Sequence, residues 1–362
     1  MNRKTTSVAL GSLAVTAALI GGAASAAAEV PAPGLAGIRP LGMGNAFIAA
    51  ADDRNALYYN PAMLFAVKGT SISGLGVQAR LDEAFNEVVN FINEHEQQFE
   101  DFDTIDATFY EELAPFDNKW VTAGASAYVD MVRPGMGFGV YSSGSGSLKI
   151  DRGVYEPRVS SKVIDDIVAT AGAAMPLGRA DITAGASVKS IWRRSSDRVL
   201  TAREVADFDP NDILSELEQA DSGFSMDFGA AWQRPESRWT AAAVVRDAFG
   251  YIDGEPIDTA LDLGGAFRPV RNAGVVREIL FAADARDVFG GESLAQAMRL
   301  GVEVRFPRLA FRGGFHQGYS SLGASFRVPI LSLDYAWYGQ ELGAFPGAER
   351  QNLHALEMRL GF

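Results

Sequence analysis

Residues 298–306 read Met-Arg-Leu-Gly-Val-Glu-Val-Arg-Phe, and this stretch shows the pattern that decides the fold of the chain. Every second residue, from Met298 to Phe306, is apolar, and the residues between them are arginine, glycine and glutamate. Successive side chains of a β-strand point to opposite faces. The period of two therefore predicts a strand with one apolar face and one polar face.

The same alternation recurs along most of the chain, for example at 222–233 and 320–328. Clusters of glycine, proline and asparagine separate the alternating stretches, as is typical of turns. The pattern predicts fourteen strands, at roughly 70–80, 119–130, 135–143, 165–176, 180–193, 222–233, 238–247, 259–270, 277–287, 296–306, 309–317, 320–328, 330–340 and 351–362.

A soluble sandwich and a membrane barrel both produce such strands, and the connections favour the barrel. Connections after even-numbered strands are short, such as 176–179 and 307–308. Most of those after odd-numbered strands are longer, such as 81–118 and 194–221. Short turns on one rim and long loops on the other are typical of outer-membrane barrels, whose short turns face the periplasm. We therefore expect an all-β, fourteen-stranded antiparallel transmembrane β-barrel.

The end of the chain supports this expectation. The last predicted strand carries apolar residues at every second position and ends on an aromatic residue. This resembles the terminal strand signal of bacterial outer-membrane barrels, which their assembly machinery reads. The residues that carry the resemblance are Leu356, Met358, Leu360 and Phe362.

The start of the chain resembles an export signal. Residues 1–28 combine the basic pair Arg3 and Lys4, an apolar run at 8–20 and an alanine-rich end. This order is the pattern of a secretory signal peptide. Together with the strands, it predicts export and insertion into the bacterial outer membrane, among lipids and lipopolysaccharide.

Composition excludes several classes of function. The 362 residues include no cysteine and three histidines, so we expect no metal site and no cofactor. The net charge of −13 argues against binding to nucleic acid. No nucleophile motif accompanies His316 or His354, so we expect no catalytic residues and no enzyme.

Residues 35–65 do not alternate like a strand that faces lipid. They contain Leu-Gly-Met-Gly-Asn-Ala-Phe at 41–47 and Tyr-Tyr-Asn-Pro-Ala at 58–62. Gly42 and Gly44 allow a close approach of backbones, and the Asn60-Pro61 pair favours a turn.

These two motifs resemble the start of the FadL-type superfamily of long-chain fatty-acid transporters, and equally its PorV-like and TraF-like relatives. In that family the segment folds inside the barrel as a plug, and fourteen strands follow. The resemblance implies a plug at 29–66 and a transmembrane barrel at 67–362. The plug motif would comprise Gly42, Gly44, Asn60, Pro61 and Ala62.

The resemblance also implies a function. FadL-type barrels take up hydrophobic compounds by passive diffusion past the plug, which makes hydrophobic small molecules the expected ligands. The PorV-like relatives imply an alternative. In it, the barrel transports nothing and acts in protein secretion or surface-protein anchoring, with a secreted or surface protein as partner.

The insertion at 81–118 is acidic and amphipathic. It holds twelve acidic residues and no lysine or arginine, and its apolar residues recur at helical spacing. We expect one or two extracellular helices over the barrel mouth. They could be a solvated cap packed on the barrel, an access groove for a hydrophobic ligand, or a docking site for a partner or for cations that bridge lipopolysaccharide. The candidate ligand contacts are Phe47, Tyr58, Phe85, Val88, Val89, Ile92 and Phe99.

Two further expectations concern polar residues. In the second insertion, 194–221, Asp209 precedes Pro210 and predicts a short helix. On the polar faces of the late strands, charges of both signs alternate. This pattern favours an ion-pair network in the lumen that holds the plug, and it is less typical of charges that line a conduction path. The members of this network are Asp284, Arg286, Arg299, Glu303, Arg305, Glu357 and Arg359.

Overall fold

The computed structural model describes most of the chain after the N-terminal region. The ranges it describes are 35, 37–95, 98, 105–153, 157–178, 181–201, 204, 217, 219–234, 236–290, 293–343 and 347–361. Residues 1–28 and Phe362 lie outside this part, as do Phe99 and the predicted helix after Asp209.

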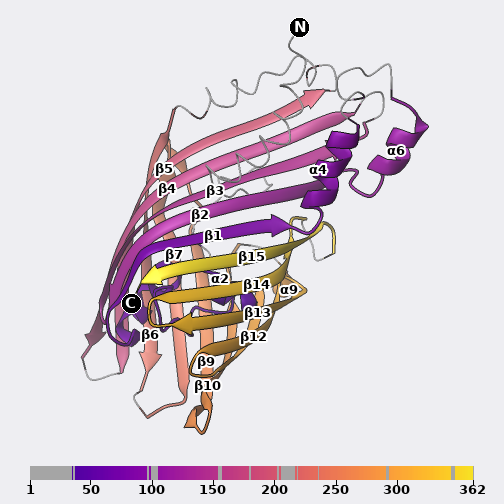
Figure 1. The fold of residues 1–362 in the computed structure, drawn as a ribbon. Coiled ribbons are helices and arrows are strands. Elements are labelled where there is room, and N and C mark those ends of the chain that lie inside the picture. Colours follow the sequence, from indigo (N-terminus) through magenta and orange to yellow (C-terminus); the bar gives the residue numbers. More distant parts are fainter. Residues whose placement is uncertain are drawn as a thin grey trace.

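Fourteen long strands form one closed antiparallel barrel (Figure 1). Each strand pairs with the next long strand in sequence, and β1 pairs with β15 to close the ring. The two-residue strand β8 pairs with β7 alone at the rim. The strands are β1 (Ser71–Asp82), β2 (Lys119–Arg133), β3 (Met136–Asp151), β4 (Arg158–Leu177), β5 (Ile182–Thr201), β6 (Asp221–Gln233), β7 (Trp239–Ile252), β8 (Glu255–Pro256), β9 (Ala260–Ala273), β10 (Val276–Ala285), β11 (Met298–Arg305), β12 (Leu309–His316), β13 (Tyr319–Val328), β14 (Leu331–Glu341) and β15 (Arg350–Gly361).

The fourteen predicted strands are confirmed, and three of them extend seven or eight residues beyond their predicted bounds at one end. Strand β3 continues to Asp151, β4 begins at Arg158 and β5 continues to Thr201. The segment at 144–149, Gly-Ser-Gly-Ser-Leu-Lys, has too few apolar residues to show the alternation, yet it pairs residue by residue with β4. The second insertion accordingly begins after Thr201 and not at 194.

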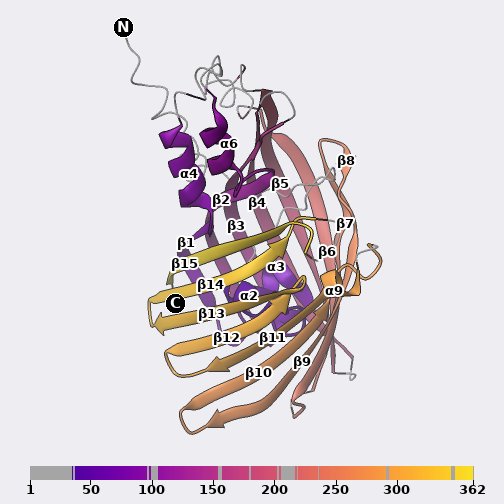
Figure 2. The same cartoon turned by 90° about the vertical axis from the view of Figure 1, so that its right-hand side faces the viewer.

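The barrel wall has unequal height (Figure 2). Strands β4 and β5 have 20 residues each, whereas β11 and β12 have eight. At about 3.3 Å per residue, these lengths correspond to about 66 Å and about 26 Å of strand. We call β3–β5 the tall wall and the short strands β10–β14 the low wall. The tall wall extends beyond the low wall on the side of the long loops.

The outward face carries the apolar residues. Large exposed side chains such as Met131, Phe138, Phe281 and Leu356 point away from the lumen all round the ring. A belt of this kind suits hydrocarbon outside and polar groups inside, which is the arrangement of membrane barrels. Among the described residues, no helix is both long and apolar enough to span a membrane.

Two helices of the acidic insertion, α4 (Phe85–Glu94) and α6 (Ala107–Leu113), form a cluster with strand residues. Their partner Val121 lies on the same face of β2 as Met131, and their partner Ile150 lies on the same face of β3 as Phe138. These faces point outward. The helices therefore pack on the outer face of β2 and β3, and the expectation that they lie over the mouth is wrong (Figure 2).

Residues 37–67, called the inner segment here, lie inside the ring (Figures 1 and 2). They form α2 (Ile38–Gly42), α3 (Ala56–Tyr59) and the 3₁₀ helix η1 (Pro61–Ala66). Helix α2 contacts β12–β15, and η1 contacts β2–β6 across the lumen. The inner segment therefore spans the barrel from one wall to the other.

Candidate functional site inside the barrel

Glycines on the barrel wall meet the backbone of the inner segment. A Cβ atom added at Gly314 would lie 2.2 Å from the Gly44 nitrogen, and one at Gly301 would lie 2.4 Å from the Met43 oxygen. Such distances leave no room for a side chain. The wall glycines that meet the backbone of the inner segment are Gly185, Gly229, Gly264, Gly301, Gly314 and Gly323, and those that meet its side chains alone are Gly137, Gly139 and Gly172.

The predicted glycine motif takes part in this contact. Gly44 has a φ of +62°, in the region that favours glycine, and its N–H donates to Ser321 Oγ at 2.8 Å. A Cβ atom at Gly42 would lie 2.9 Å from the Cα of Gly323. The two glycines thus allow α2 to rest directly on β12 and β13.

The Asn-Pro-Ala turn makes the contact on the opposite wall. Asn60 Oδ1 accepts from the Ala62 N–H at 3.0 Å, and Asn60 Nδ2 donates to the Ile48 oxygen at 3.2 Å. Gly185 and Gly229 face this turn. Asn60 is fully buried, so the turn is anchored by hydrogen bonds and by close backbone packing.

A buried ion-pair cluster joins α2 to the low wall. Arg39 donates to both oxygens of Glu303, from Nε at 2.9 Å and from Nη2 at 2.7 Å. Arg312 also donates to Glu303 at 2.6 Å and then reaches Asp334 at 3.1 Å. Two cations around one fully buried carboxylate offset the cost of removing these charges from water.

Asp52 and Asp53 complete the cluster from within the inner segment. Arg39 Nη1 donates to each of them at 2.7 Å, and Arg305 donates to Asp52 at 2.6 Å. Burial disfavours the ionised form of Asp52, but Arg39, Arg305 and Arg268 outweigh this cost. The pKa of Asp52 therefore lies well below its usual range.

The residues predicted as a lumen network are split between this cluster and other contacts. Glu303 and Arg305 belong to it. Asp284 instead accepts from the backbone N–H groups of Phe47 at 2.5 Å and Ile48 at 2.9 Å, so it binds the inner segment directly. The remaining contacts are Arg286 with Asp262 at 3.3 Å, Arg299 with the Met298 oxygen at 3.2 Å, Glu357 with Gln78 at 2.7 Å, and Arg359 with Ser71 at 3.3 Å.

Sequence patterns did not identify several of the charged residues that pair in the lumen. Arg54 of the inner segment pairs with Asp130 of β2 at 2.6 Å. Lys189 lies between Asp227 and Asp247, at 2.8 Å from each. Alternation marks the lumen face of each strand, but it does not tell which charges on different strands meet.

An apolar cluster lies on the long-loop side of the inner segment. It joins lumen-facing residues of β2–β5 and β7 with two loop residues and is touched by Tyr58. Leu35, which precedes the inner segment, is buried among these side chains. The cluster comprises Leu35, Tyr128, Tyr141, Val168, Ile191, Ile252 and Ile257.

The predicted ligand contacts lie in three separate places. Phe47 is fully buried inside the inner segment, and its ring meets Tyr59 edge to face at 5.5 Å. Tyr58 borders the apolar cluster, with its ring 5.8 Å from that of Tyr141. Phe85, Val88 and Ile92 pack on the outer flank, with the half-buried Val89 on the same helix, so they do not line the lumen.

The predicted assembly signal lies on the outer face of β15. Leu356, Met358 and Leu360 face outward on β15 and are exposed, which places them in the apolar belt. Among the described residues, no group of three or more histidine or carboxylate side chains is arranged to hold a metal ion.

Comparison with known proteins gives matches by structure alone. No family model and no curated protein matches the sequence. The solved TodX monoaromatic hydrocarbon channel, as its deltaS2 mutant, is 11% identical, with a TM-score of 0.52 over 90% of this chain and 97% of that one. The Pseudomonas putida toluene transporter TodX is also 11% identical, with a TM-score of 0.51 over 92% and 98%.

A third solved structure, the Ralstonia pickettii toluene transporter TbuX, is 14% identical, with a TM-score of 0.49 over 91% and 98% of the two chains. The two TodX structures match nearly the whole length of this chain, and TodX has the fourteen-stranded barrel of the FadL type. The chain therefore has the fold of the FadL-type outer-membrane barrels.

Proposed function

We propose that this protein is an outer-membrane channel through which hydrophobic small molecules diffuse passively, past an N-terminal plug at 29–66. Residues 1–28 would direct its export, and the assembly machinery would insert it among lipids and lipopolysaccharide. The similar solved structures are described as channels or transporters for monoaromatic hydrocarbons and toluene, which supports this class of ligand.

The observation that carries the proposal is the buried inner segment. Its residues Met43, Phe47, Leu57 and Leu64 have no exposed surface, and its two ends contact opposite walls. A solute crossing the barrel must displace part of this segment. The charged contacts of Arg39 lie at the low wall, whereas η1 contacts the tall wall mainly through backbone and apolar groups. The η1 half is therefore the part that we expect to move.

The apolar cluster around Leu35 supplies a binding place for a hydrophobic ligand. Tyr128, Tyr141, Val168 and Ile191 present apolar surface to the lumen, and Leu35 occupies it. A ligand that replaces Leu35 would recover the burial of this surface, which is worth about 25 cal/mol per Å². Displacement of Leu35, two residues before the inner segment, would couple binding to release of the plug.

A binding measurement on the purified full-length barrel tests the proposal. Toluene and a long-chain fatty acid should each bind saturably, and uptake into proteoliposomes should exceed that of empty liposomes. A variant with Val168→Asp and Ile191→Asp places charge in the apolar cluster and should lose binding. A variant with Asn90→Asp adds a charge at an exposed position of α4, outside the barrel, and should bind as the native protein does.

Absence of binding by a correctly folded barrel, judged by heat-modifiable gel migration, would contradict the channel proposal. Co-purification of a secreted protein without uptake would instead favour the alternative, a barrel acting in secretion or surface anchoring.

A further inference from the structure

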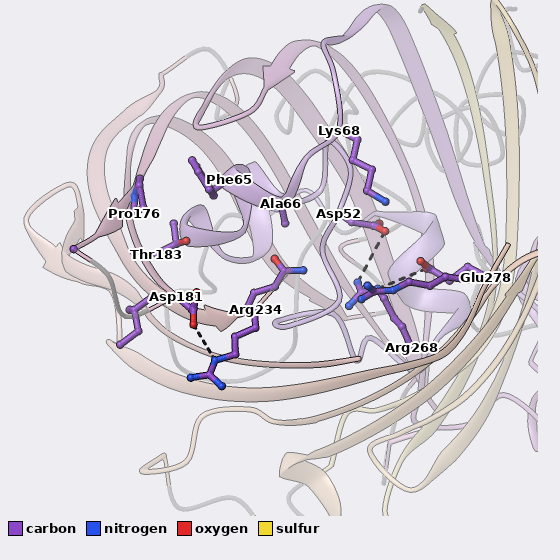
Figure 3. Close-up of a pocket in the computed structure, with 14 residues that line it drawn as sticks. Asp52, Phe65, Ala66, Lys68, Pro176, Asp181, Thr183, Arg234, Arg268 and Glu278 are labelled. Carbon is purple, nitrogen blue, oxygen red and sulfur yellow. Dashed lines mark hydrogen bonds and ion pairs between the residues drawn. The ribbon is translucent and has the colours of Figure 1, made fainter. Parts of the chain in front are cut away.

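A cavity of about 590 Å³ lies at the short-turn rim of the barrel (Figure 3). The inner segment forms one of its walls, through Asp52 and Phe65, and Lys68, the next residue after the segment, also borders it. The turn between β4 and β5 and the ends of β6, β9 and β10 form the others. Exposed side chains such as Lys68 and Arg271 border it, so it opens on the side away from the long loops. Its volume falls within the range of small-molecule sites.

The cavity has two chemically different sides. In Figure 3, Phe65 and Pro176 lie on one side, together with Thr183 and with Asp181 and Arg234, which neutralise each other in an ion pair of 2.9 Å. Ile182 of β5 also lines the cavity. The opposite side carries Lys68 and Arg268, with Asp52 and Glu278 beside them. A ligand that fills this space would need an apolar part and a polar part.

The acidic groups on the polar side are already paired. Asp52 and Glu278 each accept from Nη2 of Arg305, at 2.6 Å and 2.5 Å. Arg268 comes no closer than 4.0 Å to Asp52 and 3.7 Å to Glu278. Arg268 is buried, and its hydrogen bonds to Thr240 Oγ1 and to the Ala50 oxygen are long, at 3.4 Å and 3.2 Å. A buried guanidinium held this loosely is unusual, because burial of a cation is costly without close partners.

The other cations of this side add to the positive charge. Among the described residues, neither Lys68 nor Arg271 forms an ion pair, although Arg271 donates to the Ser237 oxygen at 3.0 Å. Of the four cations that line the cavity, Arg234 is paired with Asp181, which leaves Lys68, Arg268 and Arg271, while Asp52 and Glu278 are paired with Arg305. The polar side has an excess of positive charge, which favours an anion.

We propose that this cavity binds a small amphipathic monocarboxylate. The carboxylate would lie against Arg268, Lys68 and Arg271, where arginine and lysine donors match its oxygens. The apolar part would lie against Phe65, Pro176 and Ile182. The site lies on the other side of the inner segment from the apolar cluster around Leu35. The inference deepens the proposed function and rests on it, because the ligand would reach the site through the proposed channel.

Isothermal titration with benzoate tests the site on the purified full-length barrel, with benzyl alcohol as the neutral ligand of matched shape. Benzoate should bind saturably and at least tenfold more tightly than benzyl alcohol, and added salt should weaken it. The double variant Lys68→Gln, Arg271→Gln changes two exposed side chains and should weaken benzoate about tenfold. Phe65→Ala should weaken both ligands.

Lys149→Gln provides the matched control, because Lys149 lies over the Trp120 ring on the long-loop side of the barrel. It should leave benzoate binding unchanged. Equal binding of the two ligands, or no effect of the double variant on a barrel with native gel migration, would overturn the site. If the native barrel binds benzoate but does not take up toluene, this result would count against the proposed function and not against the site.

Discussion

Arg39 and Glu303 lie 264 residues apart in the sequence and form a two-point ion pair inside the barrel, with donor–acceptor distances of 2.9 Å and 2.7 Å. The pair joins the inner segment to β11. Because Arg305 and Arg312 also contact Glu303, this carboxylate is the common partner of three guanidinium groups.

Replacement of Glu303 by glutamine should therefore destabilise the barrel strongly. Removing the charge leaves three cations close together, and breaking a buried pair costs about 3–5 kcal/mol. Urea unfolding followed by gel migration measures the loss. The control is Lys162→Gln, which removes a partly exposed pair with Asp197 and should cost at most about 1 kcal/mol. Similar midpoints for the two variants would contradict the role of the cluster.

Replacement of Gly314 by alanine should displace the inner segment. The new Cβ would lie 2.2 Å from the Gly44 nitrogen, which cannot be accommodated without movement of the backbone. Gly313→Ala is the matched control, since its nearest contact would be 3.8 Å away. The native chain has no cysteine, so a single cysteine at the buried position Ala49 reports exposure by its reaction with a maleimide. Labelling should rise at least tenfold with Gly314→Ala and stay low with Gly313→Ala.

Replacement of Leu35 by alanine should strengthen the binding of toluene. Leu35 fills the apolar cluster, and a ligand must compete with it for the same surface. Removal of this competitor should raise affinity several-fold, as expected when the binding-competent state becomes more populated. Titration of the native and variant barrels measures the change. Weaker binding by the variant would show that Leu35 supports the ligand site instead of occupying it.

Acid should weaken the anchoring of the inner segment through Asp52. Its pKa is lowered in the folded protein, so its contribution to stability is fully present above the unfolded value of about 3.9. That contribution is lost as the pH falls through the lower, folded pKa. The stability difference between the native protein and Asp52→Asn should be constant from about pH 5 to 8 and shrink below about pH 4. Urea midpoints across this range measure it, and a constant difference down to pH 2 would argue against ionised Asp52.

Replacement of Phe109 by alanine should free α4 and α6 without opening the lumen. Phe109 is fully buried in the cluster on the outer flank, and its truncation should cost about 3–5 kcal/mol of local stability. Proteolysis within 83–118 should accelerate, while toluene binding stays unchanged. Asn90→Ala, at an exposed position of α4, is the control and should do neither. Altered toluene binding would restore the access-groove interpretation of these helices.

The sequence predicted the strands well because alternation has a direct physical cause in the two solvents on either side of the wall. It failed at 144–149, where serine and glycine pair in β3 without an apolar face to mark them. Alternation also gives no reason for the glycines of the lumen face. The structure shows the reason at Gly301 and Gly314, where the glycines admit the backbone of the inner segment.

The position of the acidic helices illustrates a second limit. Their apolar faces at Val88 and Phe109 were predictable, but an amphipathic helix can cover the mouth or the flank equally well. The helices lie on the flank because Val121 and Ile150 extend the apolar outward face beyond the belt, toward the long loops. Likewise, Arg312 and Asp334 were not predicted as partners of Glu303, because pairing across strands depends on register.

The contact between the wall glycines and the inner segment also constrains the order of assembly. The inner segment precedes β1, and β1 closes the ring against β15, the most C-terminal of the described strands. A segment that is mostly buried, and fitted against wall glycines on both sides, has to be in place when β1 pairs with β15. We therefore expect the inner segment to be enclosed during assembly of the barrel, before its first and last described strands pair, because it could not be threaded into the finished ring without displacing these close contacts.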